Sequence, residues 1–377
     1  MEYVRLGKLV DLKQGLAINS HTNHLVCDHE TSLALLRIAD MPTKRKVVFM
    51  DENTPDRYIA VEDDIIYTRT GQVGLVFTGQ KGVVHNNCFR VIPIDEQTLS
   101  RKYLFWVLSL PEVYYMANIY AAGSAQPDLP HTSFKKIKIP ISSLPTQNKI
   151  AAILSAYGNM LENNNRRIRL LEQMAVNLYK EWFIRFRFPG HDKVEFEEGL
   201  PKGWEITRIK DAIVEQPKSK VQVGNVEGNN GQYPFYTSGA NILQYNQYLV
   251  DGENILLNTG GIADVKYSIG KIHYSTDTWC IKGIDGYTLF LYLYLKGILP
   301  EINASYFEGA ALKHLKKASF KKKKILLPPE TIIERFNQQV SVMYKEIFLL
   351  KQNNQFLSRQ RDLLLPRLMS GKLEVKA

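Results

Sequence analysis

The sequence predicts a mixed α/β (α+β) protein in which two similar globular halves are separated by two long helices that form an antiparallel coiled coil. Three observations lead to this fold class: two apolar seams with heptad spacing, an internal repeat, and short strand-like segments inside each copy of the repeat. For the 377-residue chain we expect four parts. They are a first globular half at 1–144, a long helix at 145–188, a linker with the second half at 189–328, and a second long helix at 329–377.

The first seam lies in residues 145–188, where core positions recur at alternating steps of four and three. Its members are Ile150, Leu154, Tyr157, Leu161, Asn164, Ile168, Leu171, Ala175, Leu178 and Trp182. This a/d pattern favours a coiled coil over an ordinary surface helix. A helix of roughly forty residues is about 60 Å long, so it needs a partner of similar length.

The partner is expected in residues 330–369. Its seam comprises Ile333, Phe336, Val340, Met343, Ile347, Leu350, Asn354, Leu357, Arg361, Leu364 and Leu368. Antiparallel pairing with aligned midpoints places Asn164 nearly opposite Asn354, and a polar pair in a coiled-coil core fixes register. The alternative is that each asparagine faces solvent at the edge of the seam.

The long helices belong to a larger duplication with a period of roughly 185 to 200 residues. The stretch GSAQPDLPHTSFKKIKIPISSLP from Gly123 matches GAALKHLKKASFKKKKILLPP from Gly309. Upstream, a strand signal and Thr70-Gly71 are echoed by a second strand signal and Thr259-Gly260, and residues 3–6 are echoed by 204–207. The architecture is therefore expected to be half, helix, half, helix.

Short segments inside the halves have strand or helix character. In the first half we expect strands at 65–68, 75–77, 88–92 and 137–139, and helices at 102–110 and 111–120. In the second half we expect strands at 255–257, 271–274 and 278–281, and a helix at 288–296. Residues 189–202 carry Pro, Gly and acidic residues and are expected to form a linker.

Composition favours an anionic partner. Lys and Arg number 48 against 38 Asp and Glu, a net charge of +10, which suits nucleic acid. Cys27, Cys88 and Cys280 are far apart and form no CxxC motif, as is typical of a reducing compartment, so we expect a cytoplasmic protein without a signal peptide. The longest apolar run, 287–295, is too short to span a membrane.

With these motifs in hand, the chain closely resembles the DNA specificity subunit of type I restriction–modification systems. The resemblance covers essentially the whole chain and depends on GLPKGW (199–204), DDIIYTRTGQVG (63–74), the GSAQPDL run and LLLPRLMSGKL (363–373). The first half departs from the family pattern because it lacks its own GLPxGW and begins at Tyr3, which concerns the first strand of that half.

The resemblance implies a function and a set of partners. Two target recognition domains would each read one half of a bipartite double-stranded DNA sequence. The coiled coil would space them and dock two modification subunits, and restriction subunits would join through the complex. No cofactor is expected in this chain, because S-adenosylmethionine, ATP and Mg²⁺ would be bound by the partner subunits.

Motifs of catalysis are missing from the sequence. It contains no GxxxxGK[ST] loop and no [DNS]PP[YFW] tetrapeptide; Pro328-Pro329 is flanked by Leu327 and Glu330. We therefore expect a non-catalytic chain. Two alternatives stay open: a single-chain DNA-modifying enzyme, or a coiled-coil docking protein with no sequence-specific role on DNA. The cluster His21, His24, Cys27 and His29 has ligand types but no standard finger spacing, so we expect a polar loop and no metal.

Candidate contact residues fall into two groups. Basic and amide side chains outside the helices are candidates for phosphate and base contacts. They are Lys44, Arg45, Lys46, Arg69, Gln72, Asn86, Asn87, Gln126, Lys218, Lys220, Asn258, Lys266, Lys313, Lys316 and Lys317. A second apolar stripe on the long helices is the candidate docking face for partner subunits, the alternative being packing against the globular halves. It comprises Ile153, Met160, Leu170 and Met174 on the first helix, and Ile347 with Phe348 and Leu349 on the second.

Overall fold

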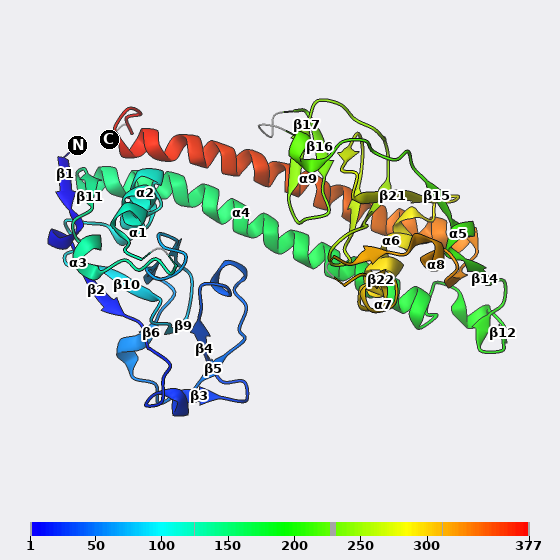
Figure 1. Ribbon diagram of the computed structural model, residues 1–377, viewed down its shortest axis with the longest axis horizontal. Helices are drawn as coiled ribbons and strands as arrows, with labels where there is room; N and C mark the ends of the chain where they lie inside the picture. Colours follow the sequence, from blue (N-terminus) through cyan, green and yellow to red (C-terminus); the bar gives the residue numbers. More distant parts are fainter. Residues whose placement is uncertain (1, 124, 227–230, 311, 376–377) are drawn as a thin grey trace. The chain divides into compact units, whose positions relative to one another are not determined.

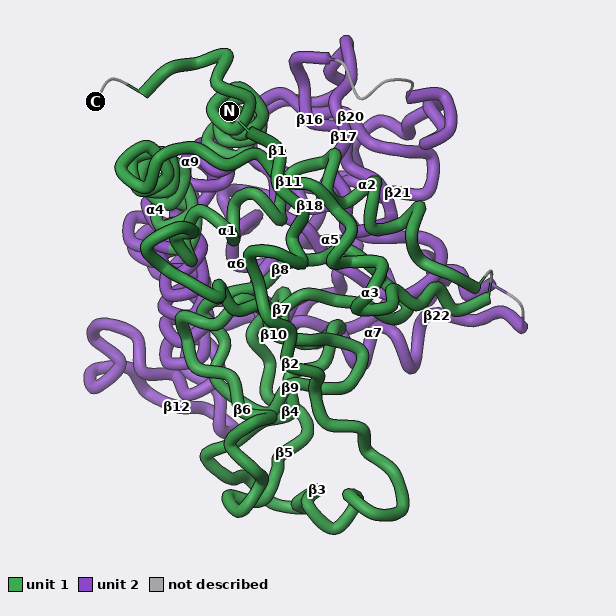
Figure 2. Tube along the Cα trace, turned by 90° about the vertical axis from the view of Figure 1, so that its left-hand side faces the viewer, with its two compact units in different colours: residues 1–162, 355–377 green, residues 163–354 purple. Residues whose placement is uncertain are grey.

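The chain forms two compact units, each described here by itself. The computed structural model describes residues 2–123, 125–226, 231–310 and 312–375, so Ser124 and Ala311 of the repeated segments lie outside the described residues. Unit 1 comprises residues 1–162 and 355–377, and unit 2 comprises residues 163–354 (Figure 2). Within the described ranges, no helix is both long and apolar enough to cross a membrane.

Two sheets and a strand pair form the β-structure described in unit 1 (Figure 1). The antiparallel sheet has the order β2-β10-β7-β8, with β2 (Val10–Gln14), β10 (Cys88–Pro93), β7 (Ile65–Thr68) and β8 (Val76–Phe77). The mixed sheet has the order β3-β5-β4-β9-β6, with β3 (Val26–Cys27), β5 (Phe49–Met50), β4 (Leu33–Leu36), β9 (Gly82–Val84) and β6 (Ile59–Ala60). β1 (Glu2–Arg5) pairs with β11 (Lys138–Ile141).

Short helices cover the β2-β10-β7-β8 sheet of unit 1. They are α1 (Arg101–Leu108), α2 (Pro111–Tyr120) and α3 (His131–Phe134), and the 3₁₀ turns are η1 (Leu6–Lys8), η2 (Asn23–Leu25), η3 (Met41–Thr43) and η4 (Asp56–Tyr58). Pro111 starts α2 because its fixed φ suits a first helical position. The rings of Tyr67, Phe89 and Phe134 pack together in the core with centroids 4.8 to 5.6 Å apart.

Unit 2 repeats this arrangement. Its antiparallel sheet has the order β15-β21-β18-β19, with β15 (Ile213–Glu215), β21 (Thr278–Gly283), β18 (Asn254–Asn258) and β19 (Val265–Ser268). β14 (Glu205–Arg208) pairs with β24 (Lys324–Leu327), and β17 (Ile242–Tyr245), β16 (Tyr233–Tyr236) and β20 (His273–Tyr274) form a small mixed sheet. β22 (Phe307–Glu308) pairs with β23 (His314–Leu315).

The helices of unit 2 explain the apolar run at 287–295. They are α5 (Ile209–Ala212), α6 (Thr288–Gly297), α7 (Leu299–Ser305) and α8 (Lys317–Phe320), with the 3₁₀ turns η6 (His191–Lys193) and η7 (Val223–Asn225). α6 is apolar on nearly every face because it is buried between the sheet and the long helices. Phe290 contacts Phe183, which in turn contacts Phe336, at centroid distances of 4.8 and 4.7 Å.

The structure confirms the duplication and corrects its register. Both units have the same four-strand order and the same edge pair, β1 with β11 and β14 with β24. The pairing aligns Tyr3 with Ile206, two residues from the alignment expected from sequence. Equivalent backbone hydrogen bonds align Thr70 with Gly260, one residue from the expected match to Thr259. Sheet register, rather than residue identity, defines the correspondence, and the first strand of unit 1 is present.

Two long helices span the seams predicted from the sequence. α4 (Leu144–Tyr179) continues through a π-helical turn, η5 (Lys180–Ile184), and α9 runs Glu330–Met369. In unit 2 the pairing is antiparallel, since Asn164 contacts Asn354 while Trp182 packs on Phe336. In unit 1, Ile150 shares a core with the 365–369 end of α9. The fold class is therefore confirmed, and every predicted seam position is buried or half-buried.

The first long helix ends before residue 188 because the chain turns out of it. Phe186 has a left-handed φ of 56°, and the N–H of Arg187 bonds back to the carbonyl of Glu181. Phe186 and Phe188 then pack on Trp204, at centroid distances of 5.1 and 5.8 Å. The segment expected to be a linker contains a hairpin, β12 (Phe196–Glu197) with β13 (Leu200–Pro201).

Gln147 anchors the start of α4 in unit 1. Its side chain is fully buried and accepts a hydrogen bond from the Ser100 N–H at 2.9 Å. Its amide donates to the carbonyls of Thr98 and Ser142, both at 2.9 Å. These bonds satisfy backbone groups at the start of α1 and before α4 that would otherwise be unpaired.

Candidate nucleic-acid interface

Three loops of unit 1 meet at the end of β7. The N–H groups of Arg69 and Thr70 donate to the carbonyl of Asn87 at 2.8 and 3.2 Å, which joins the 69–72 loop to the 85–87 turn. The Gly71 N–H donates to Pro127 at 2.9 Å, and the Leu129 N–H donates to Arg69 at 2.9 Å. We call this set of loops, whose described residues are 69–72, 85–87, 122–123 and 125–129, the unit 1 rim.

Arg69 braces the unit 1 rim. Its Nε and Nη2 donate to the two carboxylate oxygens of Asp128 at 3.1 and 2.5 Å, and its Nη1 donates to Gln14 Oε1 at 3.0 Å. Burial acts to raise the pKa of Asp128, but hydrogen bonds from Arg69 and Thr70 outweigh it and lower that pKa. The guanidinium is thus engaged within the protein, so in this conformation Arg69 positions the rim and does not project from it.

Amide side chains stand at the tips of the unit 1 rim. Gln72 and Gln126 are exposed, the first after the left-handed Gly71 and the second in the turn closed by Ala122 and Asp128. Asn86 and Asn87 are half-buried, and their carbonyls accept bonds from Gln14 and from the Arg69 loop. The two glutamines are the amides of this rim best placed for an outside partner.

The basic cluster at 44–46 directly follows the 3₁₀ turn η3 of unit 1. Lys44 ends η3 in a left-handed conformation, with φ of 54°, and its Nζ bonds to Glu162 of α4 at 2.6 Å. Both partners are more than half exposed, so this surface ion pair contributes little stability. Arg45 and Lys46 are exposed beside it.

Unit 2 has an equivalent rim. The Thr259 N–H donates to Asp277, the Gly261 N–H donates to Lys313, and the Leu315 N–H donates to Thr259, at 2.9, 2.9 and 3.0 Å. These bonds join loops whose described residues are 259–263, 275–277, 308–310 and 312–315, and which we call the unit 2 rim. Each bond has a counterpart in the unit 1 rim, so the two rims share one backbone construction.

Two sequence candidates in unit 2 face inward. Asn258 is 5% exposed, and its amide donates to the carbonyls of Ser238 and Ile262. Lys266 Nζ donates to the carbonyls of Thr237 and Gly239 at 2.7 and 2.6 Å, and burial lowers the pKa of this lysine. The expectation that these side chains are presented to bases is corrected. Both residues lie in strands, where their side chains donate to neighbouring backbone carbonyls.

The remaining lysines of unit 2 differ in how they are held. Lys317 lies over the Trp279 ring at 5.2 Å from its centroid, and burial lowers its pKa against the opposing effect of Glu215. Lys316 bonds to Glu308, which belongs to the unit 2 rim. Lys218, Lys220, Lys313 and Lys316 are all exposed, and Lys313 lies on the rim itself.

The docking candidates on α4 are exposed. Ile153, Met160, Leu170 and Met174 have relative exposures of 37 to 55%. On α9 the expectation is corrected for Ile347, which is a buried seam residue. Phe348 is half-buried and lines a hollow of about 230 Å³, and its docking role stays a prediction. The exposed apolar residues of α9 instead recur every seventh position: Val342, Leu349, Phe356 and Leu363. Only Leu349 among these was singled out by sequence, although the heptad spacing is visible there.

The predicted asparagine contact is present in the seam of unit 2. Asn164 Nδ2 donates to Asn354 Oδ1 at 2.9 Å, and Asn354 Nδ2 donates to Asn165 Oδ1 at 2.9 Å. Asn164 is 7% exposed, so its amide depends on this partner. The alternative in which both asparagines face solvent at the seam edge does not hold for Asn164; the effect on register stays a prediction.

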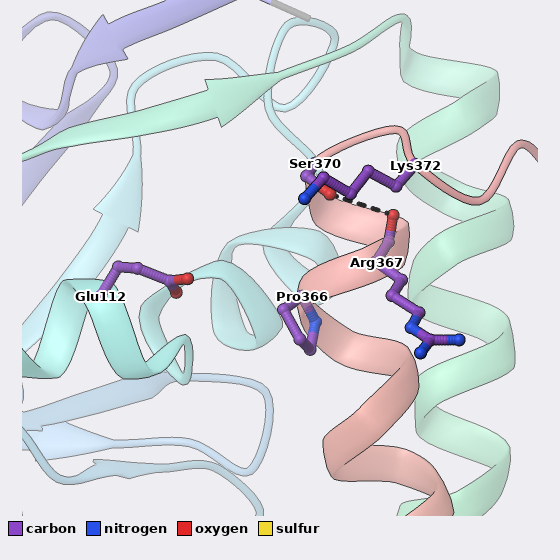
Figure 3. Close-up of a pocket in the computed structure, with 5 residues that line it drawn as sticks. All are labelled: Glu112, Pro366, Arg367, Ser370 and Lys372. Carbon is purple, nitrogen blue, oxygen red and sulfur yellow. Dashed lines mark hydrogen bonds between the residues drawn. The ribbon is translucent and has the colours of Figure 1, made fainter.

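A hollow of about 590 Å³ lies between α2 and the end of α9 in unit 1 (Figure 3). It is lined by Glu112, Pro366, Arg367, Ser370 and Lys372, and Ser370 Oγ bonds to the Arg367 carbonyl at 3.3 Å. These five side chains include no nucleophile paired with a base. Across the described residues, no group of three or more His, Cys, Asp or Glu side chains is placed to hold a metal, including the stretch 21–29.

The fold is a duplicated α/β arrangement, in which each of two units presents an equivalent set of loops. Residues 1–173 and 201–352 match the family model described as the Type I restriction modification DNA specificity domain. The chain therefore belongs to the family of type I restriction–modification DNA specificity proteins, which confirms the resemblance drawn from the sequence motifs.

Relatives of known type agree with this assignment. The chain is 26% identical over 339 residues to the type I restriction enzyme MjaIX specificity subunit of Methanocaldococcus jannaschii, covering 83% of this chain and 78% of the relative. It is 26% identical over 178 residues to the EcoDI specificity subunit of Escherichia coli, covering 46% and 39%. The solved S subunit from M. genitalium shares the fold, with a TM-score of 0.67 at 15% identity over 100% of this chain and 96% of that one.

Proposed function

We propose that this chain is a non-catalytic subunit that binds a bipartite DNA site and directs adenine methylation and restriction by partner subunits. The observation that carries the proposal is the repetition of one rim construction in two units, at loops 69–72 and 259–263. Two similar reading surfaces on one chain suit two half-sites. Family membership supports the DNA-recognition role, and the partner subunits are part of the proposal.

Exposed basic side chains of the two units would supply the contacts to phosphate. In unit 1 these are Arg45 and Lys46, and in unit 2 Lys218, Lys220 and Lys313. Each phosphate neutralised releases counterions, so affinity falls linearly with the logarithm of salt concentration. Alanine at any one of these positions is expected to weaken binding to all sequences alike and to lower the salt slope by about one.

The exposed heptad stripe on α9, with Met160 and its neighbours on α4, would dock two modification subunits. Large apolar side chains at seven-residue spacing lie along one helix face, and exposed apolar surface of this kind can mark partner sites. S-adenosylmethionine, ATP and Mg²⁺ would then be bound by the partners, in the cytoplasm where the DNA is.

The first experiment maps methylated adenines across the genome of cells that express the modification subunit with or without this chain. A split motif that disappears without the chain is the expected result. Methylation or cleavage by the purified chain alone would favour the single-chain enzyme. Binding that shows no preference in competitor DNA would favour a docking protein without a sequence-specific role.

The docking face has its own test. Leu349→Lys places a charge on the exposed stripe and is expected to abolish co-purification with the modification subunit. Gln338→Lys places the same charge at an exposed polar position of the same helix and serves as the control. Equal binding by both variants would contradict the docking assignment while leaving DNA recognition untouched.

The spacing role is tested by matched insertions. Seven residues added after Asn165 in α4 and seven before Asn354 in α9 keep both seams in phase and lengthen each helix by about 10 Å. At about 3.4 Å per base pair, the spacer of the methylated motif should grow by about three base pairs. An unchanged spacer would show that the helices do not set it.

A further inference from the structure

The tips of the two rims have the same backbone but different side chains. Gly71 and Gly261 both adopt the left-handed conformation, with φ of 81° and 84°. The side chain of Thr68 donates to the carbonyl of Gln72, and that of Asn258 donates to the carbonyl of Ile262. Gln72 and Ile262 therefore occupy equivalent positions.

A second pair of tip residues is equivalent in the same way. Gly123 has φ of 96° and Gly309 has φ of 143°. A Cβ at Gly123 would lie 3.0 Å from the carbonyl oxygen of Gln126, and one at Gly309 would lie 2.2 Å from that of Leu312. Gln126 and Leu312 thus sit opposite a glycine in the corresponding turn of each unit.

The unit 2 tips are aliphatic and strongly exposed. Ile262 has a relative exposure of 78% and Leu312 of 57%. The loops hold these residues in place, because the Gly261 N–H bonds to Lys313 and the Ala263 N–H bonds to Asn303 Oδ1 at 3.2 Å. Single exposed aliphatic residues are ordinary, but here both tips are aliphatic where both unit 1 tips are amides.

The bases of DNA offer a matching distinction. In the major groove, adenine presents a donor and an acceptor that a glutamine amide can bind bidentately, whereas thymine presents a methyl group that aliphatic side chains contact. We infer that unit 2 reads its half-site through thymine methyl groups contacted by Ile262 and Leu312, whereas unit 1 reads adenine through the amides of Gln72 and Gln126. The inference rests on the proposed bipartite DNA recognition.

Uracil substitution tests the inference, because it removes the thymine methyl and keeps every hydrogen-bonding group. The affinity of the complex of this chain with its modification subunits would be measured by competition between duplexes that carry the mapped motif. In each competing duplex one thymine is replaced by deoxyuridine. In the half-site read by unit 2, at least one substitution should weaken binding about fourfold, the value of one buried methyl group. Substitutions in the other half should have smaller effects.

Variants assign the contact to residues. With Ile262→Ala or Leu312→Ala, the thymine and uracil duplexes should bind equally at the position that each residue contacts. Gln72→Ala is the matched control from the equivalent loop: it should reduce discrimination in the other half-site and leave the uracil effect intact. The purified variants should have the same melting temperature as the wild-type chain, since these side chains are exposed.

Three results would overturn the inference. One is a unit 2 half-site without an A·T pair, and another is no uracil effect at any position. The third is a uracil effect that persists in both alanine variants, which would place the methyl contact elsewhere. If the methylation map shows no split motif for the wild-type chain, the proposed function is contradicted. In that case there is no half-site in which thymine could be replaced, so this outcome is distinct from the three above.

Discussion

The asparagine pair in the seam of unit 2 can be tested by replacing Asn164 and Asn354 together with leucine. Asn164 is almost fully buried, and its amide bonds to Asn354 at 2.9 Å, while Asn354 also bonds to the exposed Asn165. The double variant removes both polar groups of the pair at once, so neither is left buried without a partner. Asn165 loses a bond but stays exposed to water.

The magnitude follows from burial and from the lost hydrogen bond. Full burial of a leucine side chain is worth about 1.5–3 kcal/mol, and a net intramolecular hydrogen bond about 0.5–1.5 kcal/mol. Because only one of the two positions is fully buried, we expect a gain of about 1–2 kcal/mol in the free energy of unfolding of unit 2. For a unit of this size the melting temperature should rise by about 2–8 °C.

The gain in stability should be accompanied by a loss of specificity. A polar pair penalises every register except the one that brings the two amides together, and leucine removes that penalty. We expect the double variant to self-associate through its helices. Scanning calorimetry would measure the melting temperature, and analytical ultracentrifugation would measure the oligomeric state. Asn163→Leu, at an exposed position of the same turn, is the control and should change stability by less than about 0.5 kcal/mol.

The effect of the double variant on stability and its effect on register can be contradicted separately. A melting temperature below that of the wild-type chain would show that the amide pair is a net stabilising contact. A more stable variant that stays monomeric, with an unchanged hydrogen-exchange pattern along both helices, would show that the apolar seam alone defines the register.

Three further predictions concern other parts of the chain. Phe336→Ala should destabilise unit 2 by about 3–5 kcal/mol in thermal melts, because this ring is fully buried between aromatic neighbours, whereas Leu349→Ala should leave melting unchanged. Gln147→Ala should lower the urea midpoint of unit 1 by an amount equivalent to about 1–3 kcal/mol, because three backbone groups lose their partner. The hydrogen bond from Lys321 lowers the pKa of Glu215 below its ordinary value of 4.5. The ionised carboxylate therefore stabilises the folded chain above pH 4.5, and this stabilisation is lost as pH falls through the lowered pKa. Glu215→Gln should therefore flatten the loss of stability seen in urea titrations between pH 7 and pH 3.

These three predictions have distinct controls and contradictions. Equal melting of the Phe336 and Leu349 variants would mean that the aromatic cluster does not hold the helix to unit 2. Asn148→Ala, at the exposed neighbour of Gln147, should leave the urea midpoint unchanged; an equal drop for both would deny the anchoring role. If stability falls as steeply between pH 7 and pH 3 in the Glu215→Gln variant as in the wild-type chain, other carboxylates dominate the loss.

The sequence by itself determined the helices and the repeat. Apolar residues at heptad spacing predict a long helix with a partner, because helical periodicity places all of these seam residues on one face of the helix. Asn164 and Asn354 could be paired from sequence because each lies near the middle of its seam. The duplication was visible because both copies retain the same glycine, Ser-Phe-Lys-Lys group and helix-opening proline.

Only the tertiary structure decided which polar side chains face outward. Asn258 and Lys266 have the residue types of base contacts, yet neighbouring carbonyls bind both, and Arg69 is held by Asp128 from a segment about sixty residues away. Ile262 and Leu312 gave no signal for binding in the sequence, because an aliphatic residue there is expected in the core. A sequence records residue types and their order along the chain, whereas exposure depends on contacts between loops that are far apart in it. The fold class was therefore available from periodicity, and the composition of each rim was not.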